Sequence, residues 1–237
     1  LKYDYFSPNE KNRLSIFASA ANTDRDSYYG PGNDPLKAYG KTTDLIAMGG
    51  AQYVHTFDKC LFMPSDLTAG LEYNRDRLKD NMWGYDRHTD QTVNIYSAFL
   101  QNEWKNERWS ILVGGRLDKH NMVDNIIFSP RANLRFNPTQ NINLRLSYSS
   151  GFRAPQAFDE DMHIENVGGT VAMIERAKNL KEEKSQSFSA SADIYHRFGA
   201  FQTNFLIEGF YTKLTDVFVL GEPYNRGDGV LVKLRSN

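Results

Sequence analysis

The sequence has a single cysteine, Cys60, and no long apolar run. One cysteine excludes an internal disulfide and a metal site built from several thiolates. No apolar stretch approaches the roughly 20 residues that a spanning helix requires, and the mean hydropathy is −0.58. This low value is weak evidence against a membrane barrel, because barrel strands alternate and a window average conceals their apolar face.

The chain also lacks an excess of charge of either sign. Its 237 residues carry a formal net charge of −1, which gives no broad electrostatic case for binding nucleic acid. An initiator methionine and a signal peptide are missing, and the sequence opens on LKYDYF, which resembles the middle of a structural element. We therefore expect an excised or processed piece of a longer protein.

Alternation of apolar and polar residues is what the sequence has in abundance. In NINLRLSYSSGFR (141–153), one face carries Ile142, Leu144, Leu146 and Tyr148. Thirteen residues span roughly 43 Å at about 3.3 Å each, whereas sandwich strands usually have about 5–6 residues and a tilted spanning strand needs about 9–11. Further alternating segments lie at 13–20, 66–73, 109–118, 131–136, 187–194 and 201–208.

The connections between these segments are alternately short and long. WKNER (104–108), NPTQ (137–140) and RFGA (197–200) are short, whereas about 77–90 and 151–183 are long. In an up-and-down meander this order places tight turns at one end and long loops at the other, as in membrane barrels. We expect one short helical turn within 171–180.

These patterns predict an all-β fold, an antiparallel up-and-down meander of about eleven strands that forms part of a transmembrane β-barrel. The first strand (1–6) and the last, from about 230, are partial. Such a sheet has two open edges, which lipid does not tolerate, because their backbone groups would be unsatisfied. The sheet must therefore belong to a longer protein, or close or pair on itself.

The section 96–215 resembles the barrel of TonB-dependent outer-membrane receptors. No single matching piece is specific, but their order and spacing are. One detail departs from the family pattern, because Lys181 is followed by Glu182 where a proline is usual. The pieces are FLQNEW (99–104), WSILVGGRLDKH (109–120), FSPRANLRF (128–136), LRLSYSSGFRAPQAF (144–158), NLKEEKSQSFSASADIY (179–195) and EGFYTKLTDVF (208–218).

This resemblance implies a barrel of about 22 strands with a plugged lumen, of which residues 1–237 would form a segment. The plug domain, the TonB box and the signal peptide are absent from the sequence given. The implied function is active import across the outer membrane of Gram-negative bacteria, driven through the TonB complex. The cargo would be a ferric siderophore, haem, cobalamin or an oligosaccharide, with outer-membrane lipid and the plug as further partners, no cofactor and no catalysis.

Arginines share the polar faces that we assign to the lumen: Arg116, Arg131, Arg135 and Arg145. A guanidinium can fork onto a carboxylate or phosphate, so these residues are candidates for contact with anionic cargo or with the plug. Cross-strand pairing with residues such as Asp118 is the simpler interpretation. If the register continues through GFRAP, Arg153 also points inward and Phe152 outward, and Pro155 marks where pairing stops.

The acidic loop after GFRAP holds the remaining candidates, Asp159, Glu160, Asp161 and His163. Carboxylates and imidazole could bind a cation or a metal–siderophore complex, but the spacing matches no defined metal loop, so we assign no metal site. A solvated external loop is the simpler interpretation.

Two other function classes compete with the transporter. A soluble β-sandwich that binds carbohydrate fits the low hydropathy and predicts two packed sheets. An outer-membrane hydrolase would use Asp159 and His163, and we expect no hydrolysis.

Overall fold

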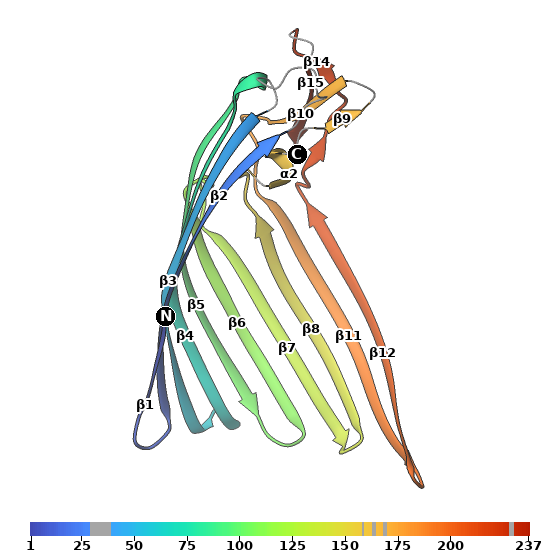
Figure 1. The fold of residues 1–237 in the computed structure, drawn as a ribbon. Helices are drawn as coiled ribbons and strands as arrows, with labels where there is room; N and C mark the ends of the chain where they lie inside the picture. Colours follow the sequence, from blue (N-terminus) through green and yellow to red (C-terminus); the bar gives the residue numbers. More distant parts are fainter. Residues whose placement is uncertain (29–38, 158, 163–164, 168–169, 228–229) are drawn as a thin grey trace.

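The computed structural model describes residues 1–28, 39–157, 159–162, 165–167, 170–227 and 230–237. A curved ten-stranded sheet, here called the wall, dominates it (Figure 1). All neighbouring wall strands pair antiparallel and in chain order, with β11 following β8. The wall strands are β1 (Lys2–Phe6), β2 (Asn12–Tyr28), β3 (Tyr39–Cys60), β4 (Met63–Met82), β5 (Arg87–Lys105), β6 (Trp109–His120), β7 (Ile127–Thr139), β8 (Ile142–Arg153), β11 (Glu183–Phe198) and β12 (Phe201–Thr215). The predicted all-β antiparallel meander, an open part of a barrel, is confirmed.

The alternation of short and long connections is also confirmed. Short turns close the lower end in Figure 1, and one of them, between β11 and β12, has Gly199 with φ +58°. The long β8–β11 connection, residues 154–182, lies at the upper end. The expected long loop at 77–90 is wrong in extent, because β4 and β5 continue to Met82 and from Arg87 around the short helix η1 (Trp83–Tyr85). The ladder continues because backbone pairing does not depend on the charged side chains there.

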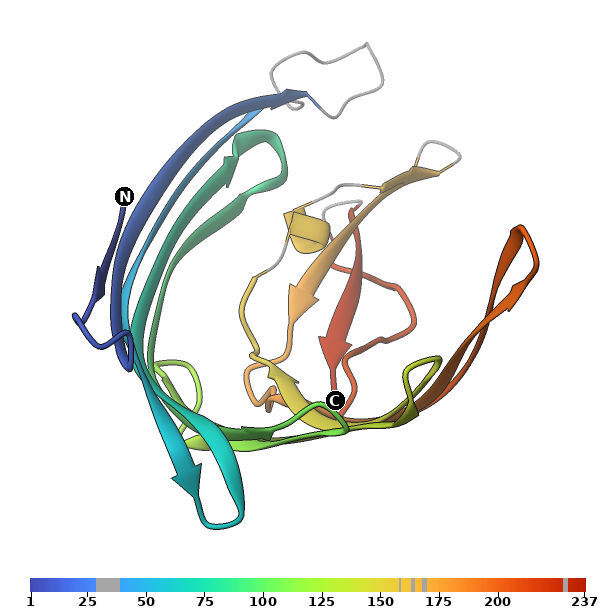
Figure 2. The same cartoon turned by 90° about the horizontal axis from the view of Figure 1, so that it is seen from below.

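A second, five-stranded sheet, here called the mouth sheet, lies at the upper end on the inner side of the curved wall (Figures 1 and 2). Its strands β10 and β15 pair in parallel, from Val171↔Val230 to Arg176↔Arg235. A short helix precedes it within the β8–β11 connection. These elements are α2 (Asp159–Met162), β9 (Glu165–Val167), β10 (Thr170–Arg176), β13 (Val219–Leu220), β14 (Tyr224–Asn225) and β15 (Val230–Ser236).

The mouth sheet corrects two expectations. The segment from about 230 is not an eleventh wall strand, and 171–180 is a strand followed by a turn rather than a helical turn. Apolar burial favours this arrangement, because the paired residues Met173 and Val232 are only 2 % and 0 % exposed. Within the described part of the chain, no helix is long and apolar enough to cross a membrane.

The two faces of the wall can be assigned from contacts with the mouth. Leu78 packs against Ala157 and Met162, and Gln91 binds the β8–β11 connection, so both side chains lie on the concave face seen in Figure 2. Side chains two residues apart share a face, and β4 pairs without irregularity from Met82 to Ser65. The even positions of β4, including Glu72, are therefore concave and the odd ones convex.

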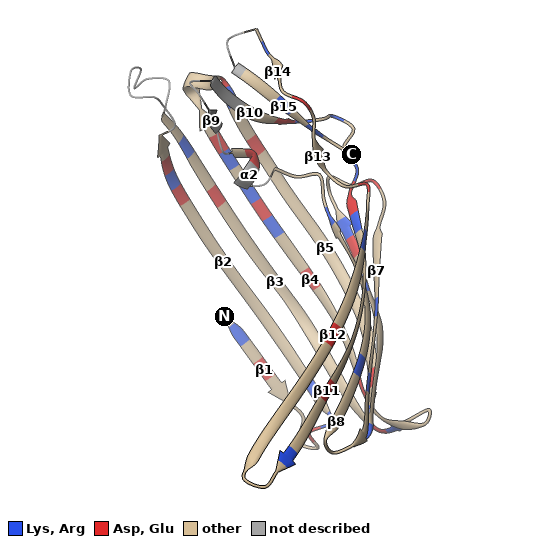
Figure 3. Cartoon of the chain, turned by 90° about the vertical axis from the view of Figure 1, so that its right-hand side faces the viewer, with Lys and Arg blue, Asp and Glu red and all other residues tan. Residues whose placement is uncertain are grey.

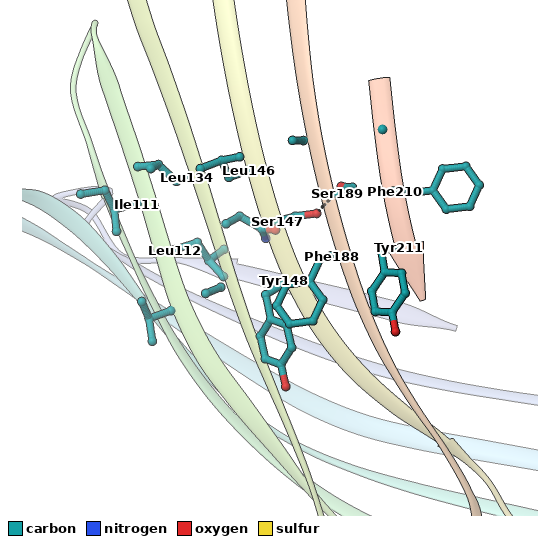
Figure 4. A pocket seen from close by; sticks show the side chains of 15 residues that line it. Ile111, Leu112, Leu134, Leu146, Ser147, Tyr148, Phe188, Ser189, Phe210 and Tyr211 are labelled. Atoms are coloured by element: carbon teal, nitrogen blue, oxygen red, sulfur yellow. Dashed lines mark hydrogen bonds between the residues drawn. The ribbon is translucent and has the colours of Figure 1, made fainter. Parts of the chain in front are cut away.

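The convex face is apolar over the middle of the wall. Leu71, Leu146, Phe205 and Ile207 are 55–65 % exposed there. Figure 4 shows a shallow apolar hollow in this region, where the Tyr148 and Phe188 rings lie 4.8 Å apart between centroids and are tilted by 38°. The Ser147–Ser189 hydrogen bond joins the same two strands from the concave face. A curved wall with an apolar outer face, which the smaller mouth sheet does not cover, does not support the β-sandwich hypothesis.

The face assignment predicts opposite effects at adjacent positions. Leu146→Lys places a charge on the convex face, which should lower the free energy of unfolding in a bilayer by about 2–4 kcal/mol. Ser147→Lys places the same charge on the polar concave face and should cost much less. Urea unfolding of both variants in lipid vesicles measures the difference, and equal losses would contradict the assignment.

Candidate functional site

Arg116 lies on the concave face and contacts two acids. Its Nη1 lies 2.5 Å from Glu72 Oε2, and its Nε lies 2.8 Å from Asp118 Oδ1. Ser97 Oγ also donates to Asp118 Oδ1 at 2.6 Å. The bond to Asp118 lies within β6, and the bond to Glu72 reaches β4 across β5, so this network links β4, β5 and β6.

Arg131 borders a hollow in the concave face beside this network. The hollow has a volume of about 430 Å³, and Gln52, Glu72, Gln101 and Arg116 also line it. Polar groups converge there from strands β3 to β7. The arrangement could accept the polar surface of a neighbouring domain or of a passing solute.

Arg135 and Arg145 lie directly opposite one another on β7 and β8. Arg145 Nε donates to Asn143 Oδ1 at 2.8 Å, whereas Arg135 Nε is buried and has no hydrogen-bond partner in the described residues. Like charges in directly opposed positions destabilise a sheet, and an unsatisfied buried donor costs about 1–3 kcal/mol. An anionic group placed between these arginines would relieve both costs.

Arg153 keeps the register that the sequence predicts. Its pairing with Glu183 continues from Gly151↔Ser185 without a shift, so it has the parity of the concave face. Its guanidinium lies 5.6 Å from the centroid of the Phe218 ring. Phe152 packs against Val123, Ile127 and Ala154, in a cluster at the upper end of β7 and β8.

The acidic loop is only partly described. Asp159 and Glu160 begin α2, but their side chains, and His163 altogether, lie outside the described residues. Asp161 is buried, and its carboxylate oxygens lie 2.9 and 3.1 Å from Arg235 Nη1. It joins the β8–β11 connection to the segment after β12. In the described residues, no three His, Cys, Asp or Glu side chains are grouped so that they could hold a metal ion.

The mouth sheet is fixed to the wall through Gln91, which sequence reasoning missed. Gln91 Oε1 accepts hydrogen bonds from Arg176 Nη1 and from the Ala157 backbone N–H, both at 2.8 Å. Burial lowers the pKa of Arg176, and Arg235 lowers it further against the opposing effect of Asp161. These partners are far apart in sequence, so no local pattern indicates them.

A polar cavity of about 230 Å³ lies between the mouth sheet and the β4–β5 hairpin. Arg87, Arg176 and Arg226 line it together with Asp86 and Glu175. Arg226 also donates to the Tyr85 carbonyl at 3.0 Å. The cavity between the mouth sheet and the hairpin is thus lined by side chains of both charges.

Comparison with known proteins identifies the class. The family model described as TonB-dependent receptor-like β-barrel matches residues 1–231. The chain belongs to the TonB-dependent receptor family. Its concave face is therefore the inner face of a receptor barrel, and its convex face is the outer face. No curated protein matches the chain significantly.

Solved structures share the fold of this TonB-dependent receptor segment at low sequence identity. The siderophore receptor PirA from Acinetobacter baumannii aligns with a TM-score of 0.70 and 16 % identity, over 100 % of this chain and 39 % of that one. A ferric enterobactin receptor mutant (PfeA, Q482A) from Pseudomonas aeruginosa, in complex with enterobactin, gives 0.71 and 17 %, over 100 % and 38 %. The siderophore receptor PirA from Pseudomonas aeruginosa gives 0.66 and 12 %, over 95 % and 45 %. The chain thus spans less than half the length of these receptors.

The buried ion pair between Asp161 and Arg235 predicts which substitution destabilises the mouth sheet. Asp161→Ala removes the carboxylate that pairs with the buried Arg235 guanidinium, which should destabilise the mouth sheet by about 3–5 kcal/mol. Amide hydrogen exchange in 170–176 and 230–236 should accelerate, while the wall stays protected. Glu175→Gln, which removes a more exposed 3.5 Å pair with Arg226, is the control and should cost about 0–1 kcal/mol. Unchanged exchange in Asp161→Ala would show that this pair does not hold the sheet.

Proposed function

We propose that this chain is the wall segment of an outer-membrane receptor that imports an anionic ferric siderophore with energy from the TonB system. The opposed pair Arg135 and Arg145 on the lumen face carries the proposal. The buried, unpartnered Nε of Arg135 calls for an anionic group that the described residues do not provide.

The similar solved structures support a siderophore among the candidate cargoes. Those reported above are described as siderophore or ferric enterobactin receptors. A ferric siderophore that carries negative charge fits an arginine-lined path, because guanidinium groups bind carboxylate and phenolate-type oxygens through charge-assisted hydrogen bonds. The chain acts as a receptor and transporter rather than as an enzyme, in keeping with its family.

The same arginines are positioned for a plug domain. A receptor barrel of about 22 strands has a plugged lumen, and acids on the plug could occupy the space between Arg135 and Arg145 when no cargo passes. Arg131, Arg153 and the acidic loop with Asp159, Glu160 and His163 are further candidates for contact with cargo or plug. Arg116 and Asp161 are assigned a structural role, since acid or base partners already engage them.

Growth on defined iron sources tests the proposal. A strain without the gene should fail to grow on one ferric siderophore under iron limitation, and the restored gene should support uptake of its labelled iron. Uptake should stop when the TonB complex is deleted. Uptake without TonB, or restored growth on haem, cobalamin or an oligosaccharide alone, would contradict the proposed cargo or its energy source.

Arg135→Gln should separate function from stability. Removing this guanidinium relieves the like-charge pair, so the free energy of unfolding of the plug-free barrel should rise by about 0.2–1 kcal/mol. Import of the ferric siderophore should fall roughly tenfold, because about 1.4 kcal/mol of binding is lost. Arg197→Gln, at the exposed short-turn end, removes the same charge and should change neither quantity. A less stable Arg135→Gln barrel with normal import would show a purely structural role.

A further inference from the structure

The convex face of β4 changes abruptly from apolar to basic. Leu71 and Tyr73 are followed on the same face by Arg75 and Arg77. The side chains of Leu71, Arg75 and Arg77 are exposed, and that of Tyr73 is half-buried. The uninterrupted pairing of β4 with both β3 and β5 leaves no bulge that could turn the arginines inward. Two guanidinium groups thus lie on the outer surface of the wall, about 7 Å apart along the strand.

Neither arginine has a hydrogen bond or an ion pair among the described residues. The residues opposite Arg75 are Ala47 and Asn94, and those opposite Arg77 are Leu45 and Thr92, all uncharged. The next convex residue on β4, Lys79, differs because it pairs with Asp90 at 3.5 Å. Arg75 and Arg77 therefore present their full donor sets to whatever surrounds the wall.

An aromatic pair lies beside these arginines on the convex face. The Tyr73 and Tyr96 rings lie 4.9 Å apart directly below Arg75, and Tyr73 Oη donates to Asn94 Oδ1 at 2.7 Å. Tyrosines with an apolar ring and a polar tip concentrate at membrane interfaces. The charged residues of β2–β4 gather toward the end of the wall that carries the long loops (Figure 3).

The change to basic residues recurs elsewhere on the convex face. On β12 the convex series Phe205, Ile207, Tyr211 is followed by Lys213, and on β6 Leu117 is followed by Lys119. Lys119 donates to the carbonyls of 123 and 124 and is thus occupied within the protein. The β4 pair differs in having two adjacent, unoccupied guanidinium groups.

We propose that Arg75 and Arg77 bind the phosphate group of a lipid in the outer leaflet. This site rests on the proposed placement in the outer membrane but is distinct from the lumen path for cargo. Guanidinium groups bind phosphate oxygens bidentately, and basic residues beside a membrane-spanning segment attract anionic headgroups. The apolar convex face below accommodates the acyl chains, while the headgroup phosphate lies level with the arginines, above the Tyr73–Tyr96 pair.

Lipid binding by the full-length receptor tests the site. The receptor is purified in detergent, mixed micelles are prepared with phosphorylated lipid A or with its dephosphorylated form, and bound lipid is counted by native mass spectrometry. The parent should prefer the phosphorylated lipid. Arg75→Gln/Arg77→Gln should lose roughly 30-fold in affinity for it, at about 1 kcal/mol for each basic residue. Thermal unfolding identical to the parent confirms that the variant is folded.

The matched control is Lys41→Gln/Lys79→Gln. These two substitutions remove the same charge from the same face. The two lysines, however, lie farther along the strands from the apolar band than the arginines do. This control should keep its affinity, and Arg75→Lys/Arg77→Lys should keep more than the glutamine variant. Equal losses in the two glutamine variants would overturn the site in favour of diffuse attraction. Retained affinity for the phosphorylated lipid in Arg75→Gln/Arg77→Gln would also overturn the site. Displacement of the lipid by inorganic phosphate would do the same.

The same strains distinguish this site from the proposed function. Cargo uptake in Arg75→Gln/Arg77→Gln should persist, because the arginines lie outside the lumen. If uptake of ferric siderophore is absent in the parent while selective lipid binding is present, the import proposal fails and the lipid site stands.

Discussion

Satisfaction of the backbone in a medium without water is the constraint on which this structure depends. Lipid cannot hydrogen-bond exposed N–H and C=O groups, so a spanning sheet must pair every strand with its neighbours. The long, mostly unbroken ladders from β1 to β12 meet this requirement within the wall. The pleat then gives each strand a convex and a concave face, and over the middle of the wall the residue types follow: leucine, phenylalanine and alanine on the convex face, serine, arginine and acids on the concave face.

The lumen face shows two ways of holding charge. Arg116 is neutralised locally by Glu72 and Asp118, so it stabilises the wall whatever fills the lumen. Arg135 and Arg145 lie opposite each other with no ion pair to an acid among the described residues, and this arrangement has a cost that an anionic partner would offset. On the proposed function, this contrast separates arginines that stabilise the wall from arginines that would meet a plug or a cargo, although all of them share the same strand pattern.

Much of the wall could be predicted from sequence because its information is local. Alternation over 141–153 assigned the faces of β8, and the order of short and long connections assigned the two ends. The role of Arg145 could not be predicted, because its opposition to Arg135 depends on the register of β7 against β8, which shifts between Phe136 and Thr139. The mouth sheet could not be predicted either, because its pairing is also not local. Strands β10 and β15 are about 60 residues apart in the chain and pair in parallel.

Spin-label accessibility along β8 tests the central claim, that alternate residues face lipid and lumen, most directly. In a Cys60→Ser background, labels are placed singly at Leu144, Arg145, Leu146 and Ser147 of the receptor in a bilayer. Labels at 144 and 146 should be accessible to oxygen in the lipid, and labels at 145 and 147 to a water-soluble nickel complex. Accessibility without a period of two, or with the two sets exchanged, would contradict the account.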